Sequence, residues 1–383
     1  MLPTKKRIGI LGGGQLGKML IEASRPWNIN NTILEADLNC PAALVADKVI
    51  LGNLYDADKI REIASEVDVL TYEIEHVNTD VLLALEAEGL EIIPSPRILQ
   101  IIQDKGLQKQ FFEKNSIPSA QFKLVAKNDE FVACMHHFTG EKVVLKFRTG
   151  GYDGKGVLIV KKEDLIQGKV IIDQPCLIEQ YHENIVEYAV IVARGKDGES
   201  VSFPSIEMYF NPITNLVEFL FSPTRMDEKL DQECRKIAMA AIEAFNGPGL
   251  FAVELFVDQG GEVLVNEIAP RPHNSGHHTI EGCYTSQFEQ LNRILLGFPL
   301  GSTQLIQPAA MLNLVGPENF TGEYVLTNTE DLLAMEGVYI HLYNKNVIKP
   351  NRKMGHITIL AETLDEVFLK AEKVRKWLTF KSV

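Results

Sequence analysis

Two short apolar segments near the middle of the chain each carry a carboxylate where a protein core would not hold one. They are residues 250–257, LFAVELFV, and residues 262–268, EVLVNEI, and a Gly-rich segment at 258–261 joins them. This pattern predicts a β-hairpin. Because side chains alternate along a strand, an even-length turn would place Glu254 and Glu267 diagonally on one face. Two desolvated carboxylates at such a short separation repel each other unless a cation lies between them, and Mg²⁺ is the usual cation. The alternative is one solvated acid at each end of the hairpin.

The segment that follows Glu267 gathers side chains suited to binding. Residues 269–278 read APRPHNSGHH and include Arg271, His273 and Asn274. Pro and Gly mark this segment as a loop that leaves a strand, and binding residues concentrate in such loops. The sequence therefore predicts that this loop and the paired acids belong to one site.

A lysine and a glycine-rich segment add the features of a phosphate site. Lys146 lies within the apolar run 143–147, where an ammonium group must meet an anion or lose its proton. Residues 149–156, TGGYDGKG, can wrap phosphate oxygens with their backbone amides. They do not follow the GxxxxGK(S/T) pattern, which excludes a P-loop fold. The alternative is a hairpin turn with an incidental lysine, and the paired acids disfavour it.

Glycines near the N-terminus allow a different interpretation. Gly12, Gly14 and Gly17 follow an apolar strand and match the dinucleotide fingerprint, with Glu35 about 20 residues further on. An NAD(P)-dependent oxidoreductase is therefore an alternative, although such glycines also serve close helix–strand packing. Glu73 follows the carboxyl end of another predicted parallel strand, where ligands of open α/β sheets lie. It is a candidate for holding an amine-bearing substrate, and the alternative is the start of a capped helix with surface acids.

Two strand ends between residues 176 and 190 could hold a planar base and a ribose. Glu179 ends an apolar strand ahead of Gln180, Tyr181 and His182, and Glu187 opens the next strand. A strand edge offers backbone donors and acceptors to a base, and a nearby carboxylate suits ribose hydroxyls. Taken alone, either acid is as well explained as a surface residue.

A basic cluster near the C-terminal end stands out in an acidic chain. Lys345, Lys349, Arg352 and Lys353 fall within nine residues that contain no acid. Such local positive charge could clamp a phosphate monoester. The alternative is a solvated edge strand that lysines protect from pairing.

The elements that must position these residues fall into three parts. Strands alternate with helices over residues 1–100, which predicts a doubly wound parallel sheet, and a helical connector is expected over 97–115. Residues 101–298 predict an α+β domain with a mostly antiparallel sheet, a flap subdomain at about 117–175 and a long helix at 228–245. Residues 299–383 predict short strands and a terminal helix.

Composition narrows the class of protein. The 383 residues are 45% apolar, enough for two or three domains. A net charge of −13 argues against a broad nucleic-acid or anionic-membrane surface. The five scattered cysteines form no CxxC motif, which is typical of reduced thiols. Without an apolar run of about 18 residues we expect no membrane span, and a soluble cytoplasmic protein.

The order of these motifs resembles the ATP-grasp superfamily, and within it the ATP-dependent 5-(carboxyamino)imidazole ribonucleotide synthases of purine biosynthesis. The resemblance covers nearly the whole chain, through GGGQLGKM at 12–19, YEIEHV at 72–77, GGYDGKG at 150–156, NEIAPRPHNSGH at 266–277 and RKMGH at 352–356. It implies an ATP-grasp fold of mixed α/β and α+β class: a Rossmann-like preATP-grasp domain at 1–100, an ATP-grasp domain at 101–298 and a small β-rich domain at 299–383.

The resemblance also implies a role for each candidate residue. Lys105 and Lys146 would reach the ATP phosphates under a flap formed by Gly151, Tyr152, Asp153, Gly154, Lys155 and Gly156. Glu179, Gln180, Tyr181 and His182 would line adenine, with Glu187 on the ribose. Glu254 and Glu267 would bind Mg²⁺, or Mn²⁺ in its place. Aminoimidazole ribonucleotide would contact Glu73, Tyr152, Asp153, Lys345, Arg352 and Lys353, and bicarbonate or carboxyphosphate would face Arg271, His273 and Asn274.

One position departs from the superfamily. Many ATP-grasp enzymes place a metal-binding Asn two residues after the second Glu, and here that residue is Ala269. Asn266 or water would complete the metal shell. The implied activity is carboxylation of the ribonucleotide amine through carboxyphosphate, with Glu73 or His273 as general base, in a homodimer. The alternatives are another ATP-grasp ligase, the NAD(P)-dependent oxidoreductase and a non-catalytic nucleotide-binding protein of the same fold.

Overall fold

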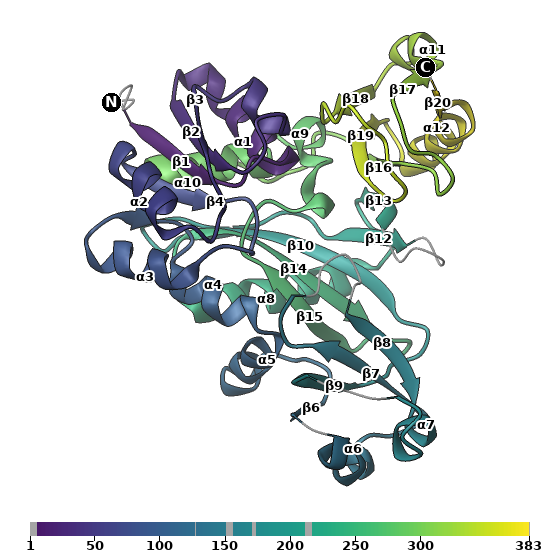
Figure 1. Cartoon of the computed structure of the whole chain (residues 1–383). Helices are drawn as coiled ribbons and strands as arrows, with labels where there is room; N and C mark the ends of the chain where they lie inside the picture. Colours follow the sequence, from purple (N-terminus) through teal and green to yellow (C-terminus); the bar gives the residue numbers. More distant parts are fainter. Residues whose placement is uncertain (1–5, 127, 151–155, 171–173, 211–216, 383) are drawn as a thin grey trace.

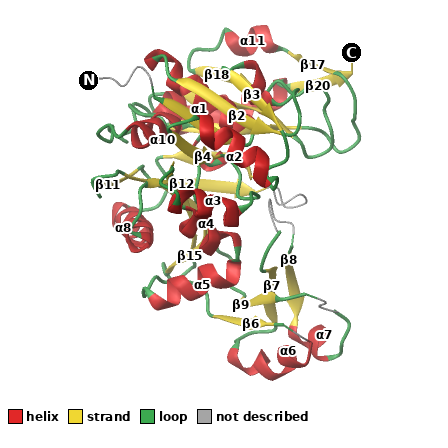
Figure 2. Cartoon of the chain, turned by 60° about the vertical axis from the view of Figure 1, so that its left-hand side comes forward, coloured by secondary structure: helices red, strands yellow, loops and turns green. Residues whose placement is uncertain are grey.

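The computed structural model describes all of the 383 residues except 1–5, 127, 151–155, 171–173, 211–216 and 383. Figure 1 and Figure 2 show an N-terminal part and a C-terminal part above a long central sheet, with a smaller lobe below it. The predicted combination of a parallel-sheet domain, an ATP-grasp domain and a C-terminal β-rich part is confirmed.

The N-terminal part is a five-stranded parallel sheet with helices on both faces. Its strands lie in the order β3-β2-β1-β4-β5. The bounds are β1 (Arg7–Leu11), β2 (Asn30–Glu35), β3 (Lys48–Leu51), β4 (Val69–Tyr72) and β5 (Glu91–Ile92). The helices are α1 (Gln15–Ser24), α2 (Ala57–Glu66) and α3 (Thr79–Ala87), with short 3₁₀ turns at Arg25–Trp27 and Pro41–Leu44. Helix α1 packs on one face of the sheet, while α2 and α3 pack on the other.

The connector predicted over 97–115 is helical, as expected, and it consists of two helices. Helix α4 (Pro96–Gln103) and helix α5 (Lys105–Lys114) meet at Asp104, whose backbone is extended. The carboxylate of Asp104 accepts hydrogen bonds from the backbone N–H groups of Gly106 and Leu107 at 2.8 and 3.2 Å, and so caps α5. This break places Lys105 in the first turn of the new helix.

The lower lobe is a four-stranded antiparallel sheet, ordered β6-β9-β7-β8, and Figure 2 shows α6 and α7 at its far end. The strands are β6 (Phe122–Val125), β7 (Lys142–Phe147), β8 (Val157–Lys161) and β9 (Cys176–Gln180). The helices are α6 (Asn128–Cys134), which leads into a 3₁₀ turn at Met135–His137, and α7 (Lys162–Ile166).

The central antiparallel sheet runs through the predicted boundary at residue 299. Its order is β15-β14-β10-β12-β13-β16-β19-β18, with β11 paired to β10. The strands are β10 (Val186–Arg194), β11 (Ser200–Ser202), β12 (Ile206–Phe210), β13 (Val217–Ser222), β14 (Gly249–Val257), β15 (Val263–Ala269), β16 (Ala309–Val315), β18 (Val338–Leu342) and β19 (Lys353–Leu360). Because β13 pairs with β16, the strands of the C-terminal part extend the ATP-grasp sheet.

The remaining elements cover this sheet. They are α8 (Glu228–Phe245), a 3₁₀ turn at Asn274–Gly276, α9 (Thr279–Gly282), α10 (Gln287–Leu296), α11 (Thr329–Leu333) and α12 (Leu364–Trp377). A separate two-stranded sheet pairs β17 (Tyr324–Thr327) with β20 (Thr379–Ser382).

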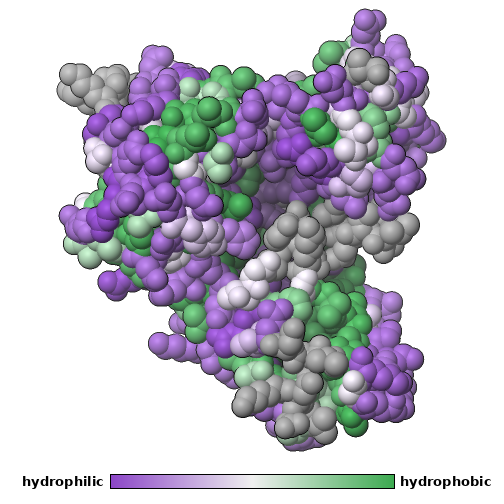
Figure 3. Space-filling view, in the orientation of Figure 1, coloured by the Kyte–Doolittle hydropathy of each residue, from purple (hydrophilic) through white to green (hydrophobic). Residues whose placement is uncertain are grey.

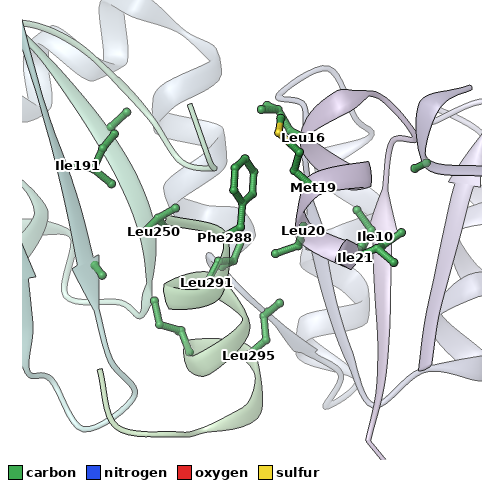
Figure 4. Packing of buried hydrophobic residues seen from close by; sticks show 14 of the residues in the cluster. Ile10, Leu16, Met19, Leu20, Ile21, Ile191, Leu250, Phe288, Leu291 and Leu295 are labelled. Carbon is green, nitrogen blue, oxygen red and sulfur yellow. The ribbon is translucent and has the colours of Figure 1, made fainter. Parts of the chain in front are cut away.

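The alternation of side chains along β14 decides what each face of the sheet contacts. Odd-numbered residues such as Phe251 and Val253 join the core under α8. Even-numbered residues such as Leu250 and Ala252 join the core that contains α10 and α1. Figure 4 shows side chains of this second core packed between the N-terminal part and α10. Glu254 follows the even-numbered set, so it lies on the face that the N-terminal part overhangs.

Candidate active site

The two predicted acids lie directly opposite each other on β14 and β15. Glu254 pairs with Glu267 in the strand register, whereas Leu255 pairs with Val265, so Asn266 is an extra residue in a β-bulge. The predicted route to this geometry was wrong, because an odd number of residues separates the paired Val257 and Val263. Without the bulge, Glu267 would point to the other face. The bulge, rather than an even-length turn, brings both carboxylates together.

The pKa values of the two paired acids shift in opposite directions. Burial and the neighbouring charge of Glu267 raise the pKa of Glu254. Lys105 forms an ion pair with Glu267 and lowers the pKa of that carboxyl. Burial by itself would lower the pKa of Lys105, but Glu267 outweighs it and the net shift is upward. Lys105 therefore neutralises Glu267, whereas burial and the charge of Glu267 disfavour the ionised form of Glu254.

Glu187 adds a third carboxylate to the same face of the sheet. It lies on β10 two residues before Ala189, which pairs with Glu254 across β14. Burial raises the pKa of Glu187 to about 7, and the charge of Glu267 adds to that shift. Three acids thus lie on one face of the sheet, and Lys105 forms an ion pair with one of them, Glu267.

Lys146 and Glu179 meet in the interior behind these acids. Lys146 Nζ lies 2.6 Å from Glu179 Oε2 and donates a hydrogen bond to Asn266 Oδ1 at 2.7 Å. The side chain of Glu179 is thus paired with a cation, so only the backbone of Glu179 could contact a base. Asn266 also approaches Glu254, with its Nδ2 3.5 Å from Oε2. The predicted lysine and the predicted acids therefore belong to one cluster.

Sequence reasoning missed Lys109, which contacts Glu179 from the other side. Its Nζ lies 2.7 Å from Glu179 Oε1. Lys105 and Lys109 stand four residues apart on α5, so both project from one side of the helix. That spacing, directly after a capping Asp104, was the available signal. The two helical lysines, Lys146 and Glu267 line one narrow cleft together with Gln108, Leu177 and Asn266.

The segment predicted to meet a base lies at the end of β9. Gln180, Tyr181 and His182 line an open hollow of about 350 Å³ with Thr139, Asp258 and Gln259. Hollows of this size accommodate small organic ligands. The predicted flap residues Gly151, Tyr152, Asp153, Gly154 and Lys155 lie outside the described residues. Gly156 is described, with a φ of 81° and a carbonyl oxygen that accepts the Phe147 N–H at 2.9 Å.

Glu73 fills the anion position of the N-terminal glycine loop. Its two carboxylate oxygens accept hydrogen bonds from Gly14 N at 2.5 Å and Gly17 N at 2.7 Å. A Cβ added at Gly14 would lie 2.6 Å from Glu73 Oε1, so glycine is needed for this approach. Burial raises the pKa of Glu73 although both amides oppose the shift. A dinucleotide pyrophosphate would have to occupy the same amides, which counts against the NAD(P) alternative.

The loop after β15 contains the three candidate residues Arg271, His273 and Asn274. Arg271 Nη2 lies 2.8 Å from Glu75 Oε1 of the N-terminal part. His273 Nε2 lies 3.6 Å from Glu254 Oε1, while Nδ1 contacts Ser275 Oγ at 2.9 Å. Asn274 exchanges two side-chain hydrogen bonds of 2.8 Å with Asn313 on β16. His273 thus brings its imidazole beside one of the paired acids.

The basic cluster reaches the glycine loop from the C-terminal part. Lys345 Nζ donates hydrogen bonds to Gln15 Oε1 at 3.1 Å and to the Lys353 carbonyl oxygen at 2.7 Å. Arg352 Nη1 donates to the Val347 carbonyl oxygen at 2.7 Å. Lys345 and Lys353 therefore lie close to the N-terminus of α1. Gln15, the first residue of that helix, precedes Lys345 by 330 residues in the sequence. Figure 3 shows a hydrophilic recess between the N-terminal and C-terminal parts.

Three further observations limit the chemistry of the described residues. They contain no group of three or more His, Cys, Asp or Glu side chains arranged as a ready-made metal site. No helix among them combines the length and apolar character needed to cross a bilayer. Cys40, Cys134, Cys176, Cys234 and Cys283 are buried free thiols.

Three family models match consecutive parts of the chain. The ribonucleotide synthetase preATP-grasp domain matches residues 5–103, and the ATP-grasp domain matches residues 110–288. The C-terminal domain of phosphoribosylaminoimidazole carboxylase matches residues 309–369. Lys146 and the acids around it fall within the second match, Lys105 and Lys109 fall between the first match and the second, and the basic cluster falls within the third.

Known proteins resemble the chain over nearly its whole length. It is 34% identical to N5-carboxyaminoimidazole ribonucleotide synthase of Bacillus subtilis, covering 97% of this chain and 95% of that protein. The crystal structure of N5-carboxyaminoimidazole ribonucleotide synthetase from Thermotoga maritima is 41% identical, with a TM-score of 0.89 and coverage of 99% and 100%. The synthase from Aspergillus clavatus, in complex with ADP and 5-aminoimidazole ribonucleotide, is 33% identical, with a TM-score of 0.88 and coverage of 97% and 98%.

Other curated relatives are longer than this chain. The chain spans about two thirds of the length of those named phosphoribosylaminoimidazole carboxylase, 67% in one case and 65% in another.

Proposed function

The chain belongs to the N5-carboxyaminoimidazole ribonucleotide synthase family of ATP-grasp ligases, and we propose that it carboxylates 5-aminoimidazole ribonucleotide with ATP and bicarbonate in purine biosynthesis. The observation that carries the proposal is the opposed pair Glu254 and Glu267 beside Lys105 and Lys146. This arrangement places cations that could bind a phosphate chain beside acids that could bind a divalent metal.

ATP would lie along this cleft. Lys105 and Lys146 would bind its phosphates, with residues 151–156 covering them. The segment from Glu179 to His182 would line adenine, and Glu187 would bind the ribose. Support comes from the shared cleft of the two lysines and Glu267, and from the solved relatives that bind ADP or ATP.

The paired acids and Asn266 form a donor set that fits Mg²⁺. Glu254 and Glu267 supply carboxylate oxygens, and the bulge brings the amide of Asn266 beside them, so Ala269 need not contribute a ligand. Hard oxygen donors of this kind suit Mg²⁺, and Mn²⁺ as a substitute. When bound, such a metal ion neutralises charge on the phosphates that are transferred.

The ribonucleotide would lie in the recess between the N-terminal and C-terminal parts. Lys345, Arg352 and Lys353 would bind its phosphate, and Glu73, Tyr152 and Asp153 would contact the rest of the molecule. The hydrogen bond from Lys345 to Gln15 supports this placement, because it joins the basic cluster to the glycine loop that Glu73 holds. A relative of the same family binds 5-aminoimidazole ribonucleotide together with ADP.

The reaction would proceed in three steps. Bicarbonate attacks the γ-phosphorus of ATP and gives carboxyphosphate and ADP, with Arg271, His273 and Asn274 facing the bicarbonate. Catalysis of this step is positioning and charge neutralisation by the lysines. Carboxyphosphate then breaks down to CO₂ and phosphate, which requires a site closed to water. The exocyclic amine of the ribonucleotide attacks CO₂ and forms the carbamate while a base accepts its proton.

His273 is the better candidate for this base. Both oxygens of Glu73 already accept hydrogen bonds from backbone N–H groups. These hydrogen bonds would be lost if Glu73 accepted a proton and rotated. The imidazole of His273 lies at the paired acids, and its Nδ1 is held by Ser275.

The test is an ADP-release assay combined with ¹³C-bicarbonate. We expect ADP release that requires both bicarbonate and 5-aminoimidazole ribonucleotide, and ¹³C in the carbamate of the product. ADP release that is indifferent to the ribonucleotide, or that requires formate or an amine in place of bicarbonate, would contradict the proposal.

We also propose that the protein acts as a homodimer in the cytoplasm. Five buried free thiols suit a reducing compartment, and the dimer rests on the family resemblance alone. Light scattering after size exclusion would give twice the 42.8 kDa chain mass for a dimer, and the chain mass itself would refute it.

A further inference from the structure

Lys109 is a buried ammonium group that has no task in the proposed mechanism. It lies on α5, and only 2% of it is exposed. Besides its contact with Glu179, its Nζ donates to the carbonyl oxygen of Val265 at 3.3 Å. Burial lowers the pKa of Lys109 although Glu179 opposes the shift. A lysine held at this cost in the interior calls for a partner that needs its charge.

That partner is Glu179, which Lys109 shares with Lys146. Each oxygen of the carboxylate meets one lysine, at 2.7 Å from Lys109 and 2.6 Å from Lys146. Burial would raise the pKa of Glu179, but the two lysines outweigh it and lower that pKa to about 2. The carboxylate is therefore ionised, and the cluster of two ammonium groups and one carboxylate carries one net positive charge.

Lys109 and Lys146 both line the narrow cleft, and Lys146 is the one that contacts a residue beside the paired acids. Its second contact is Asn266 Oδ1 in the bulge beside Glu267, at 2.7 Å, whereas Lys109 contacts the backbone of β15. We propose that Lys109 is a positioning residue for ATP: it neutralises Glu179 so that the charge of Lys146 remains available to the phosphates. This inference rests on the proposed nucleotide site.

Loss of the Lys109 charge has a specific consequence. In Lys109→Met the remaining Lys146–Glu179 pair is neutral, and phosphate must compete with Glu179 for Lys146. We expect ATP to bind about tenfold more weakly or worse, the range known for residues that hold metal-binding side chains in place. In the double variant Lys109→Met/Glu179→Gln the net positive charge returns, so ATP binding should recover to within about threefold of the wild type.

The experiment is titration calorimetry of ATP with magnesium, without ribonucleotide. The variants are Lys109→Met, the double variant, Lys109→Arg and, as control, Lys114→Met at the exposed end of the same helix. Thermal melting verifies that each variant is folded at the temperature of the titration. We expect weaker binding for Lys109→Met only, with Lys109→Arg and the double variant close to the wild type.

Two results would overturn the inference. One is a folded Lys109→Met variant that binds ATP with the wild-type dissociation constant, which would make Lys109 a purely structural residue. The other is a double variant that has lost ATP binding. The double variant provides this test even if Lys109→Met alone does not fold. A wild-type protein without ATP affinity would refute the proposed function as well, whereas failure of these variants alone leaves that function standing.

Discussion

Replacing Glu267 by Gln separates the role of the paired acids in catalysis from their role in stability. Glu254 and Glu267 are directly opposed on neighbouring antiparallel strands, which places their side chains about 5 Å apart. At an effective dielectric constant of about 20, two charges at that separation repel by about 3 kcal/mol. Glu267→Gln removes this repulsion and also the ion pair with Lys105, whose side chain is 20% exposed and remains partly hydrated.

Whether Glu267→Gln stabilises or destabilises the fold depends on the ionisation of Glu254. Because its pKa is raised in the folded state, Glu254 destabilises the fold as pH rises through that pKa, and Glu267→Gln should reduce this loss. We expect the free energy of unfolding to increase by about 1–2 kcal/mol near pH 9 and to change little near pH 6. Catalysis should fall about 100-fold or more, because a ligand for the charge-neutralising metal is lost.

Urea unfolding at both pH values and the ADP-release assay measure the two effects. Glu262→Gln, on an exposed acid at the hairpin turn, is the control and should leave both unchanged. Near-normal turnover of Glu267→Gln would refute the reasoning. A variant that is less stable at about pH 9 would show that the Lys105 ion pair, rather than repulsion, dominates the site.

Further changes address other parts of the site. Burial raises the folded-state pKa of Glu187 from 4.5 to about 7, so its favourable contribution is present below 4.5 and is lost as pH rises through 7; Glu187→Gln should flatten the pH dependence of the thermal midpoint in that window. Lys353→Met should raise KM for the ribonucleotide about tenfold and leave KM for ATP unchanged, and an equal rise in both would contradict separate sites. Gly14→Ala should destabilise by about 1–3 kcal/mol in urea unfolding, because its Cβ would meet Glu73 Oε1 at 2.6 Å, whereas Gly260→Ala in the exposed turn should not. Lys105→Met should tighten Mn²⁺ binding in the absence of nucleotide, measured by electron paramagnetic resonance, because Lys105 then no longer occupies Glu267.

Local sequence patterns were sufficient for much of the fold. The helix predicted at 228–245 has those bounds in the structure, and Asp227 caps it. The parallel N-terminal sheet follows from strands that alternate with helices, since such strands are buried on both faces. The connector predicted over 97–115 is helical, but periodicity does not reveal the break at Asp104, whose side chain caps a second helix.

The site depended on contacts that sequence patterns do not encode. The acids of the hairpin were identified from their apolar surroundings, but the bulge at Asn266 that brings them to one face leaves no pattern in the sequence. Lys109 was missed because a lysine on an amphipathic helix is usually solvated, and its burial arises from β9 and β15, which are remote in sequence. The contact between Lys345 and Gln15 joins opposite ends of the chain.

The most direct test of the central claim is a crystal structure of the protein with ADP and Mn²⁺, using anomalous scattering to locate the metal. The account predicts an anomalous peak within bonding distance of carboxylate oxygens from both Glu254 and Glu267, with Lys105 moved from Glu267 to the phosphates. A metal bound elsewhere, or these two side chains still apart from metal and nucleotide, would contradict it.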